Sequence, residues 1–380
     1  MPLRWPAPFM ASGQAVLIAG LSARALAASA RRAGYRPLVA DVFGDEDTRA
    51  AALAYQGLTM DFERGIDAEE LMTALEALAT VAPPTGIVCA SGFEDRPELI
   101  AALAKRWRLM GNPADLIARL KDPTAFAALC QTQGVPHPPT RATPPPDPAG
   151  WLVKRRGGAG GAHIHAAPDR TGGTVYYQRQ VPGRAISALL LANGRSAALL
   201  GLSAQWPAPT TDKPFRYGGA VRPAAADAAC AARLTETVHR LVAAVGLHGL
   251  NSMDFMVHDD AFWLLEINPR PGATLDIFEP ARGSLFALHV AACEGVLPAR
   301  PPALAGAMAH GILYTDRGLP SVPTITWPAW TADRPRAATP VGRGHPVCSV
   351  LARAPTGAGA TALLADRMAA LRNALEARTA

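Results

Sequence analysis

The chain has 380 residues, 49% hydrophobic and 18% charged, a balance typical of a folded protein with two or three domains. Its net charge is +6, but basic and acidic residues are interspersed and no spacing of an RNA-binding or zinc-finger module occurs, so we expect no nucleic-acid partner. No run of about eighteen apolar residues is present, and prolines interrupt the N-terminal segment where a signal peptide would be apolar. We therefore expect a cytoplasmic protein with no membrane partner.

The cysteines indicate neither a disulfide framework nor a zinc site, because they are odd in number, widely spaced and without a C-x-x-C pair. We expect each to be a small buried residue. The five are Cys89, Cys130, Cys230, Cys293 and Cys348.

The first part of the chain has the pattern of a small parallel α/β domain. Residues 14–20 read as an apolar strand, 21–33 as a helix and 37–42 as a second strand. A helix over 68–79 and a strand over 86–89 continue the alternation. The first turn offers only Gly20 and no G-x-G-x-x-G, which argues against a nicotinamide site.

Lysine is rare in this arginine-rich chain, which has only Lys105, Lys121, Lys154 and Lys213. A retained lysine suggests a place for a compact charge, such as a phosphate contact. Residues 121–134 read as a helix opened by Asp122-Pro123, and a proline-rich stretch follows to Pro148. Taken alone, Lys121 would be an ordinary solvated helix residue.

A glycine-rich segment follows the strand predicted over 151–156, which contains Lys154. Its glycines are Gly157, Gly158, Gly160 and Gly161. Such a segment can bring backbone N–H groups close to an anion, although the Walker A order is absent. Glycines leave little to pack, so we expect a mobile flap; the alternative is a plain surface loop.

Paired strands are predicted on both sides of a helix. Asn193-Gly194 between two apolar strands is a strong hairpin signal, and a helix over 235–245 ends at Gly246. Strands over 253–257 and 262–267, joined by the polar residues 258–260, predict a second hairpin.

That second hairpin would place Asp254 opposite Glu266, and the alternation of side chains puts Asn268 on the same face. Three oxygen ligands of this kind suit Mg²⁺. Arg270, two residues further on, adds a fixed cation suited to phosphate or carboxylate. The alternative is an ordinary hairpin that ends in a solvated turn.

These features together resemble the ATP-grasp superfamily, whose members typically carry D…E-x-N, often continued as E-x-N-x-R. The resemblance is to carboxylate-amine ligases, with a C-terminal extension similar to that of biotin carboxylase. It implies an α/β and α+β fold, with a Rossmann-like domain over residues 1–115. An ATP-grasp core with a flap at about 150–185 would occupy residues 116–300, and residues 301–380 would complete the core.

The resemblance also implies roles for individual residues. Asp254, Glu266 and Asn268 would hold Mg²⁺, with Mn²⁺ as the alternative ion, while Lys154 and Arg270 would act in catalysis. The residues implied in ATP binding are Lys121, Lys154, Gly157, Gly158, Gly160, Gly161, Gln178, Arg179, Gln180 and Val181. Many members have an acidic residue at or beside the position of Gln178, so side-chain recognition of adenine is open here.

The implied activity is an ATP-dependent ligase that joins a small-molecule carboxylate to an amine through an acyl phosphate, in cofactor or small-molecule biosynthesis. Carboxylation through carboxyphosphate and non-catalytic nucleotide binding are the alternatives. A homodimer is compatible with the resemblance. After a helix predicted over 278–294, the tail has strand-like segments and a terminal helix, and we expect His345 and Cys348 to be structural.

Overall fold

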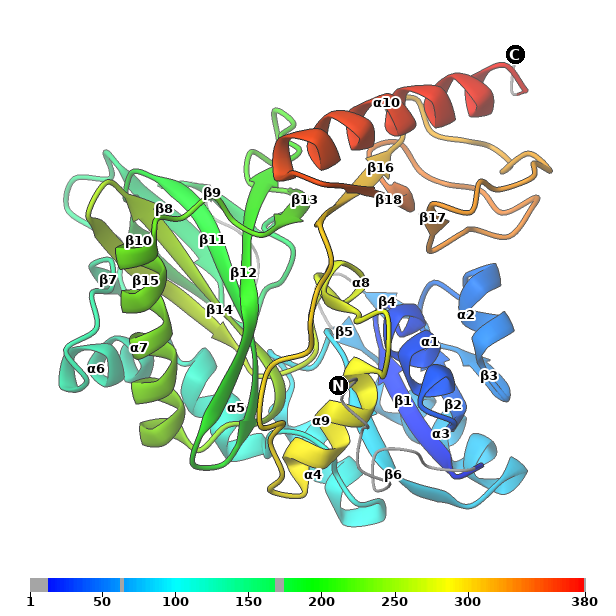
Figure 1. The fold of residues 1–380 in the computed structure, drawn as a ribbon, viewed down its shortest axis with the longest axis horizontal. Helices are drawn as coiled ribbons and strands as arrows, with labels where there is room; N and C mark the ends of the chain where they lie inside the picture. Colours follow the sequence, from blue (N-terminus) through cyan, green and yellow to red (C-terminus); the bar gives the residue numbers. More distant parts are fainter. Residues whose placement is uncertain (1–12, 62–64, 168–173, 379–380) are drawn as a thin grey trace.

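The computed structural model of the protein describes residues 13–61, 65–167 and 174–378 (Figure 1). The first part contains a parallel sheet in the order β3-β2-β1-β6 and a small β4-β5 pair. Its elements are β1 (Ala15–Gly20), α1 (Arg24–Arg32), β2 (Arg36–Asp41), α2 (Glu46–Ala51), β3 (Ala54–Gly57), β4 (Met60–Asp61), β5 (Gly65–Ile66), α3 (Ala68–Val81), β6 (Pro84–Cys89), α4 (Pro97–Arg106) and α5 (Ala114–Lys121).

The strand β1 is buried along its whole length, as in a parallel sheet covered on both faces. Val16 and Ile18 pack in one core with α1 and α9, whereas Leu17 and Ala19 pack in another with α3 and α4. The predicted α/β pattern is therefore confirmed for the described part of this region.

Lys121 ends one helix instead of opening the next, so the helix predicted over 121–134 was wrong at its start. Asp122 separates α5 from α6 (Pro123–Thr132), and its carboxylate caps α6 by accepting from the N–H groups of Thr124 and Ala125. Because Asp122 precedes a proline, its backbone is extended (ψ 115°) and the helix cannot continue through it.

The glycine-rich segment lies in a small antiparallel sheet of order β7-β10-β8-β9. The strands are β7 (Thr140–Arg141), β8 (Trp151–Arg155), β9 (Ile164–Ala166) and β10 (Val175–Arg179). The segment connects β8 to β9, and its role as a flap stays a prediction. Residues 168–173 of the predicted flap region lie outside the described residues.

An eight-stranded sheet of order β15-β14-β11-β12-β13-β16-β18-β17 forms the largest part of the molecule. Its strands are β11 (Arg184–Asn193), β12 (Ala197–Pro207), β13 (Tyr217–Arg222), β14 (His248–His258), β15 (Ala261–Asn268), β16 (Ala307–Tyr314), β17 (Thr331–Ala332) and β18 (Pro346–Ala354). The helices that accompany it are α7 (Ala228–Val245), α8 (Leu275–Phe278), α9 (Leu285–Cys293) and α10 (Gly357–Glu376).

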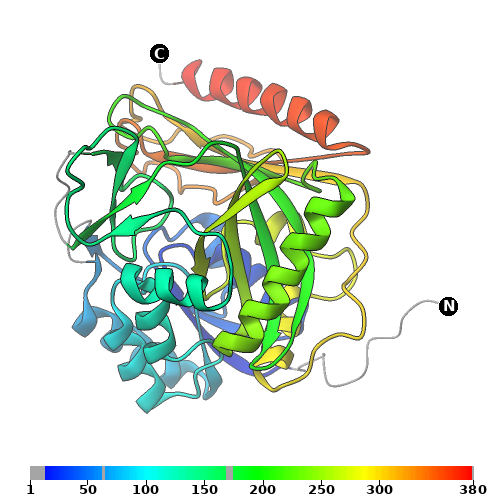
Figure 2. The same cartoon turned by 90° about the vertical axis from the view of Figure 1, so that its left-hand side faces the viewer.

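The tail belongs to this same sheet. The strand β16 pairs with β13, so residues after 301 extend the sheet that carries the predicted metal-site hairpin. Figures 1 and 2 show α10 as an outermost element, packed on β16 and β18. This pairing supports an extension that completes the core, while the domain boundaries at 115 and 300 stay predictions.

One helix prediction in the second half was wrong. The helix predicted over 278–294 is interrupted, since α8 ends at Phe278 and α9 begins at Leu285 after a Ser284 cap. Pro280 disfavours a helical conformation at Glu279, and Gly283 adopts a left-handed φ of 86°.

A buried ion cluster joins three distant parts of the chain. Arg24, at the start of α1, donates to Asp276 of α8 at 2.5 Å and to Asp333 of the tail at 2.9 Å. No local sequence pattern predicts this contact, because the partners are about 250 and 310 positions away.

All five cysteines are free thiols in this structure, four of them buried and Cys293 partly exposed. Within the described residues, no helix combines the length and apolar character that crossing a membrane requires.

Candidate functional site

The hairpin of β14 and β15 forms as the sequence predicts. Its register pairs Asp254 with Glu266 and Ser252 with Asn268, and the turn residue Asp259 takes a left-handed φ of 46°. The pairing shifts by one residue just after Asp254, which marks a β-bulge. Asp254, Glu266 and Asn268 therefore lie together at one end of the hairpin.

Hydrogen bonds fix the orientation of these oxygen donors. Asn268 Nδ2 donates to Asp254 Oδ2 at 2.9 Å, and Ser187 Oγ donates to Asp254 Oδ1 at 2.6 Å. Ser187 lies on β11 directly opposite Asp254. A neighbouring strand thus holds the carboxylate in place, a contribution that was not predicted from the sequence.

An ammonium group already lies among the oxygens. Lys121 Nζ is 3.0 Å from Glu266 Oε2 and 3.0 Å from Asn268 Oδ1. The arrangement fits a divalent cation in donor type, since carboxylate and amide oxygens converge on a positive charge. A metal at this position would displace Lys121 towards a neighbouring anion, such as a phosphate.

The pKa values of Asp254 and Glu266 are shifted in opposite directions. Burial, and then repulsion from Glu266, raise the pKa of Asp254. For Glu266 the effect of burial is outweighed by Lys121 and Lys154, which hold the pKa of its carboxyl below the usual range. Glu266 also keeps 42% of its side-chain surface exposed, so this ionised group is open to a ligand.

Lys154 projects from β8 into the same region. Its side chain is buried, and Nζ donates to Gln178 Oε1 at 2.6 Å. Burial lowers the pKa of Lys154, while Glu266 and Asp254 act in the opposite direction. The hydrogen-bond partner of Lys154 is therefore the neutral amide of Gln178 and not a carboxylate.

A pocket lies beside Lys121 and extends under the glycine segment. The residues that line it are Leu120, Lys121, Pro123, Phe126, His137, Thr140, Arg155, Gly157, Gly158, His163, Tyr176, Gln178, Leu265 and Glu266. Its wall thus combines apolar and aromatic side chains with the ion pair of Lys121 and Glu266. This combination suits a ligand with a flat apolar part and a charged part.

Three of the four glycines make close contacts, so the expectation that they have little to pack was wrong. A Cβ on Gly157 would lie 2.6 Å from the backbone of Asp95, and one on Gly158 would lie 2.5 Å from the His163 ring. A Cβ on Gly161 would lie 2.0 Å from the carbonyl oxygen of Phe215. Glycine is required here for close approach as well as for flexibility.

A β-carbon on residue 157 cannot fit against Asp95 in the loop after β6. We therefore expect Gly157→Ala to separate the glycine segment from that loop and to raise the KM for ATP by about tenfold or more. Gly160→Ala is the matched control, because Gly160 has a similar φ (69° against 67°) but a β-carbon there would have nothing within 4 Å. Steady-state kinetics of both variants checks this. Equal KM values would mean that the contact with Asp95 is unimportant.

The predicted adenine hinge lies mostly beside the pocket. Gln178 lines it, whereas the side chains of Arg179 and Gln180 are exposed. Arg179 N–H donates to Pro139 O at 2.8 Å and Gln180 N–H to Gly150 O at 2.9 Å. A backbone contact from either residue to a base would therefore use its carbonyl oxygen, and the hinge role of residues 178–181 stays a prediction.

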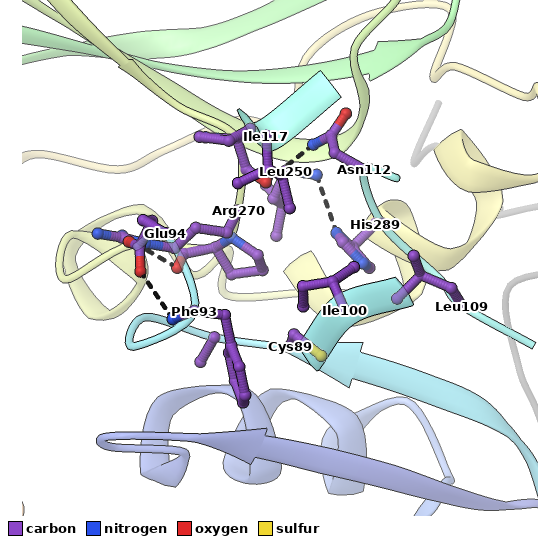
Figure 3. Close-up of a pocket in the computed structure, with 14 residues that line it drawn as sticks. Cys89, Phe93, Glu94, Ile100, Leu109, Asn112, Ile117, Leu250, Arg270 and His289 are labelled. Atoms are coloured by element: carbon purple, nitrogen blue, oxygen red, sulfur yellow. Dashed lines mark hydrogen bonds and ion pairs between the residues drawn. The ribbon is translucent and has the colours of Figure 1, made fainter. Parts of the chain in front are cut away.

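The Nε atom of Arg270 faces the loop that follows β6. Its Nε donates to Glu94 Oε1 at 2.5 Å, and both residues line a small buried cavity with apolar neighbours such as Phe93 and Ile117 (Figure 3). Burial alone would lower the pKa of Arg270, but the attraction of Glu94 outweighs it and raises the pKa above its usual value, so the guanidinium stays charged. Glu94 was not predicted from the sequence.

Comparison with known proteins identifies a domain in the middle of the chain. Residues 124–274 match the family model described as an ATP-grasp domain. These residues form an ATP-grasp domain. The matched residues include Lys154, the four glycines, Asp254 and the E-x-N-x-R segment, while Lys121 lies just before them.

Solved structures share this ATP-grasp architecture over most of the chain. The biotin carboxylase of Campylobacter jejuni, in a β-γ-ATP complex, is 16% identical, with 92% of this chain and 89% of that chain covered and a TM-score of 0.72. The biotin carboxylase domain dimer of Hydrogenobacter thermophilus 2-oxoglutarate carboxylase, solved with MgADP, ADP and bicarbonate, is 11% identical. The match covers 94% of this chain and 89% of that chain, also with a TM-score of 0.72.

Rhizobium etli pyruvate carboxylase is 15% identical, with 94% of this chain and 37% of that chain covered and a TM-score of 0.72. No match to this ATP-grasp chain is found among curated protein sequences. The identities of 11–16% to these solved structures establish the fold and not the activity. The predicted α/β and α+β ATP-grasp fold is therefore confirmed, and coverage above 90% includes part of the tail.

Proposed function

We propose that the protein is an ATP-dependent ligase that activates a small-molecule carboxylate and joins it to an amine. The observation that carries this proposal is that oxygens of Glu266 and Asn268 converge on the Lys121 ammonium beside the pocket, with Asp254 hydrogen-bonded to Asn268. Oxygen donors around a cation next to lysines are what a triphosphate requires.

The position of each group in the site suggests which part of ATP it would bind. The pocket under the glycine segment would take the base and ribose, and Lys154 would contact the phosphates in place of its present partner Gln178. The cation position would hold Mg²⁺, which when bound spreads the charge on the β- and γ-phosphate oxygens. Lys121, released from Glu266 and Asn268, would lie within reach of the same phosphates.

The proposed reaction needs no nucleophile from the protein. An oxygen of the substrate carboxylate attacks the γ-phosphorus, the bond from that phosphorus to the β–γ bridging oxygen breaks, and ADP leaves. The amine nitrogen then attacks the acyl carbon, phosphate departs with the former carboxylate oxygen, and the nitrogen loses a proton. Arg270 would stabilise the negative oxygens formed in both steps.

Carboxylation through carboxyphosphate is the second candidate. It is favoured by the similarity of the fold, tail included, to biotin carboxylases, one of which was solved with MgADP and bicarbonate. In this scheme bicarbonate takes the place of the substrate carboxylate, so the same residues around the cation would serve.

Trapping with hydroxylamine distinguishes the two candidates. In bicarbonate-free buffer with MgATP and a screen of carboxylates, we expect one carboxylate to give a hydroxamate, with one ADP per hydroxamate. Glu266→Gln protein is the blank, because its ADP release should be lower by about a hundredfold or more under the same conditions. ADP release that strictly requires bicarbonate, with no hydroxamate from any carboxylate, would favour the carboxylase instead.

A further inference from the structure

The loop after β6 connects the N-terminal sheet to the candidate site at two points. Glu94 accepts a hydrogen bond from Arg270, and the backbone of Asp95 lies so close to Gly157 that a β-carbon there would approach within 2.6 Å. One short loop therefore contacts both the arginine of the E-x-N-x-R segment and the glycine segment. The Glu94 side of this contact is visible in Figure 3.

The Glu94 carboxylate is held from both sides. One oxygen, Oε2, accepts from the N–H groups of Gly92 at 2.8 Å and Phe93 at 3.0 Å, while Oε1 accepts from Arg270. The residue is only 5% exposed. Because both oxygens are engaged by fixed donors, the carboxylate cannot turn without losing buried hydrogen bonds.

This fixed carboxylate determines where the guanidinium of Arg270 points. Among the described residues, the hydrogen bonds of Arg270 use Nε, to Glu94, and Nη1, to Pro271 O at 3.3 Å. A guanidinium is planar, so two bonded nitrogens define the direction of the third. The Nη2 end is thereby oriented. The negative charges of Glu266 and Asp254 also contribute, after that of Glu94, to the raised pKa of Arg270.

We propose that Glu94 is a positioning residue that aims Arg270 at the group being transferred. The inference rests on the proposed function, in which Arg270 stabilises oxygens that become negative during transfer. On this proposal, Glu94 contributes little to the affinity for the nucleotide before the reaction. It contributes more to stabilising the negative charge that develops on the transferring group.

The test needs no knowledge of the acceptor, because MgADP with aluminium fluoride imitates the transferring phosphoryl group. We expect Glu94→Gln, which keeps the shape but removes the charge, to bind MgADP within about twofold of the wild type. Its affinity for MgADP with aluminium fluoride should fall about tenfold or more. Glu98→Gln is the matched control, since Glu98 lies nearby on α4, is 61% exposed and pairs with Arg96.

A double-mutant cycle separates positioning from a merely structural role. If Glu94 acts through Arg270, Glu94→Gln added to Arg270→Gln should cause no further loss of aluminium fluoride affinity. Glu94→Asp, which keeps the charge, should recover part of the loss and serves if Glu94→Gln does not fold.

Three results would overturn the inference: additive losses in the cycle, unchanged affinity in Glu94→Gln, or no gain from aluminium fluoride in the wild type. Wild-type protein that does not bind MgADP at all would instead refute the proposed function itself. The two failures are therefore distinguishable by titration calorimetry.

Discussion

Glu266→Gln and Asn268→Ala are each expected to lower ATP turnover by about a hundredfold or more with little loss of folding stability. Each change removes an oxygen from the set that surrounds the cation position, where Lys121 Nζ now lies 3.0 Å from both side chains. The site acts by stabilising charge, so a lost donor affects the reaction directly. ADP formation by purified variants, with melting temperatures measured alongside, is the assay.

Asp259→Asn provides the control for these variants. Asp259 lies at the tip of the same hairpin with 89% of its side chain exposed, and asparagine tolerates its left-handed φ of 46°. This variant should turn over ATP at the wild-type rate. Near-normal ADP formation by both Glu266→Gln and Asn268→Ala would remove the metal-site assignment.

The second large effect is expected at Lys154. Its ammonium is buried and within 2.6 Å of Gln178 Oε1, so it is a localised charge next to a residue that lines the proposed nucleotide pocket. Lys154→Ala should weaken ATP binding by roughly a hundredfold, the usual loss when a buried charge partner is removed. Titration calorimetry with ATP and Mg²⁺ measures the change.

Lys105→Ala is the matched control, since Lys105 is exposed on α4 and lies outside the pocket lining. Its affinity for ATP should equal that of the wild type. If the two lysine variants bind ATP equally well, Lys154 does not contact phosphate and the glycine segment is an ordinary loop.

Local patterns in the sequence predicted the parts of the site that depend on neighbouring residues. Alternation along β15 placed Glu266 and Asn268 on one face, and the polar turn at 258–260 fixed the register that sets Asp254 opposite Glu266. The strand before the glycines likewise placed Lys154 next to the flap. These features need only strand geometry and turn chemistry.

Contacts between distant segments could not be predicted in this way. Glu94 meets Arg270 across 176 positions, and Arg24 meets Asp333 across 309. Neither acid differs in its local pattern from a solvated surface residue. The contact between Lys121 and Glu266 was missed for the same reason, since the two residues are 145 positions apart. Asp122 and Pro123 end the helix of Lys121, which brings its side chain to Glu266.

The assignment of Asp254, Glu266 and Asn268 as the cation site of a nucleotide-binding ATP-grasp enzyme can be decided by a crystal structure with MgADP. We predict Mg²⁺ at about 2.0–2.1 Å from oxygens of these residues, with Lys121 Nζ moved from Glu266 and Asn268 towards a phosphate. Nucleotide bound with its metal elsewhere, and Lys121 still paired with Glu266 and Asn268, would contradict this assignment.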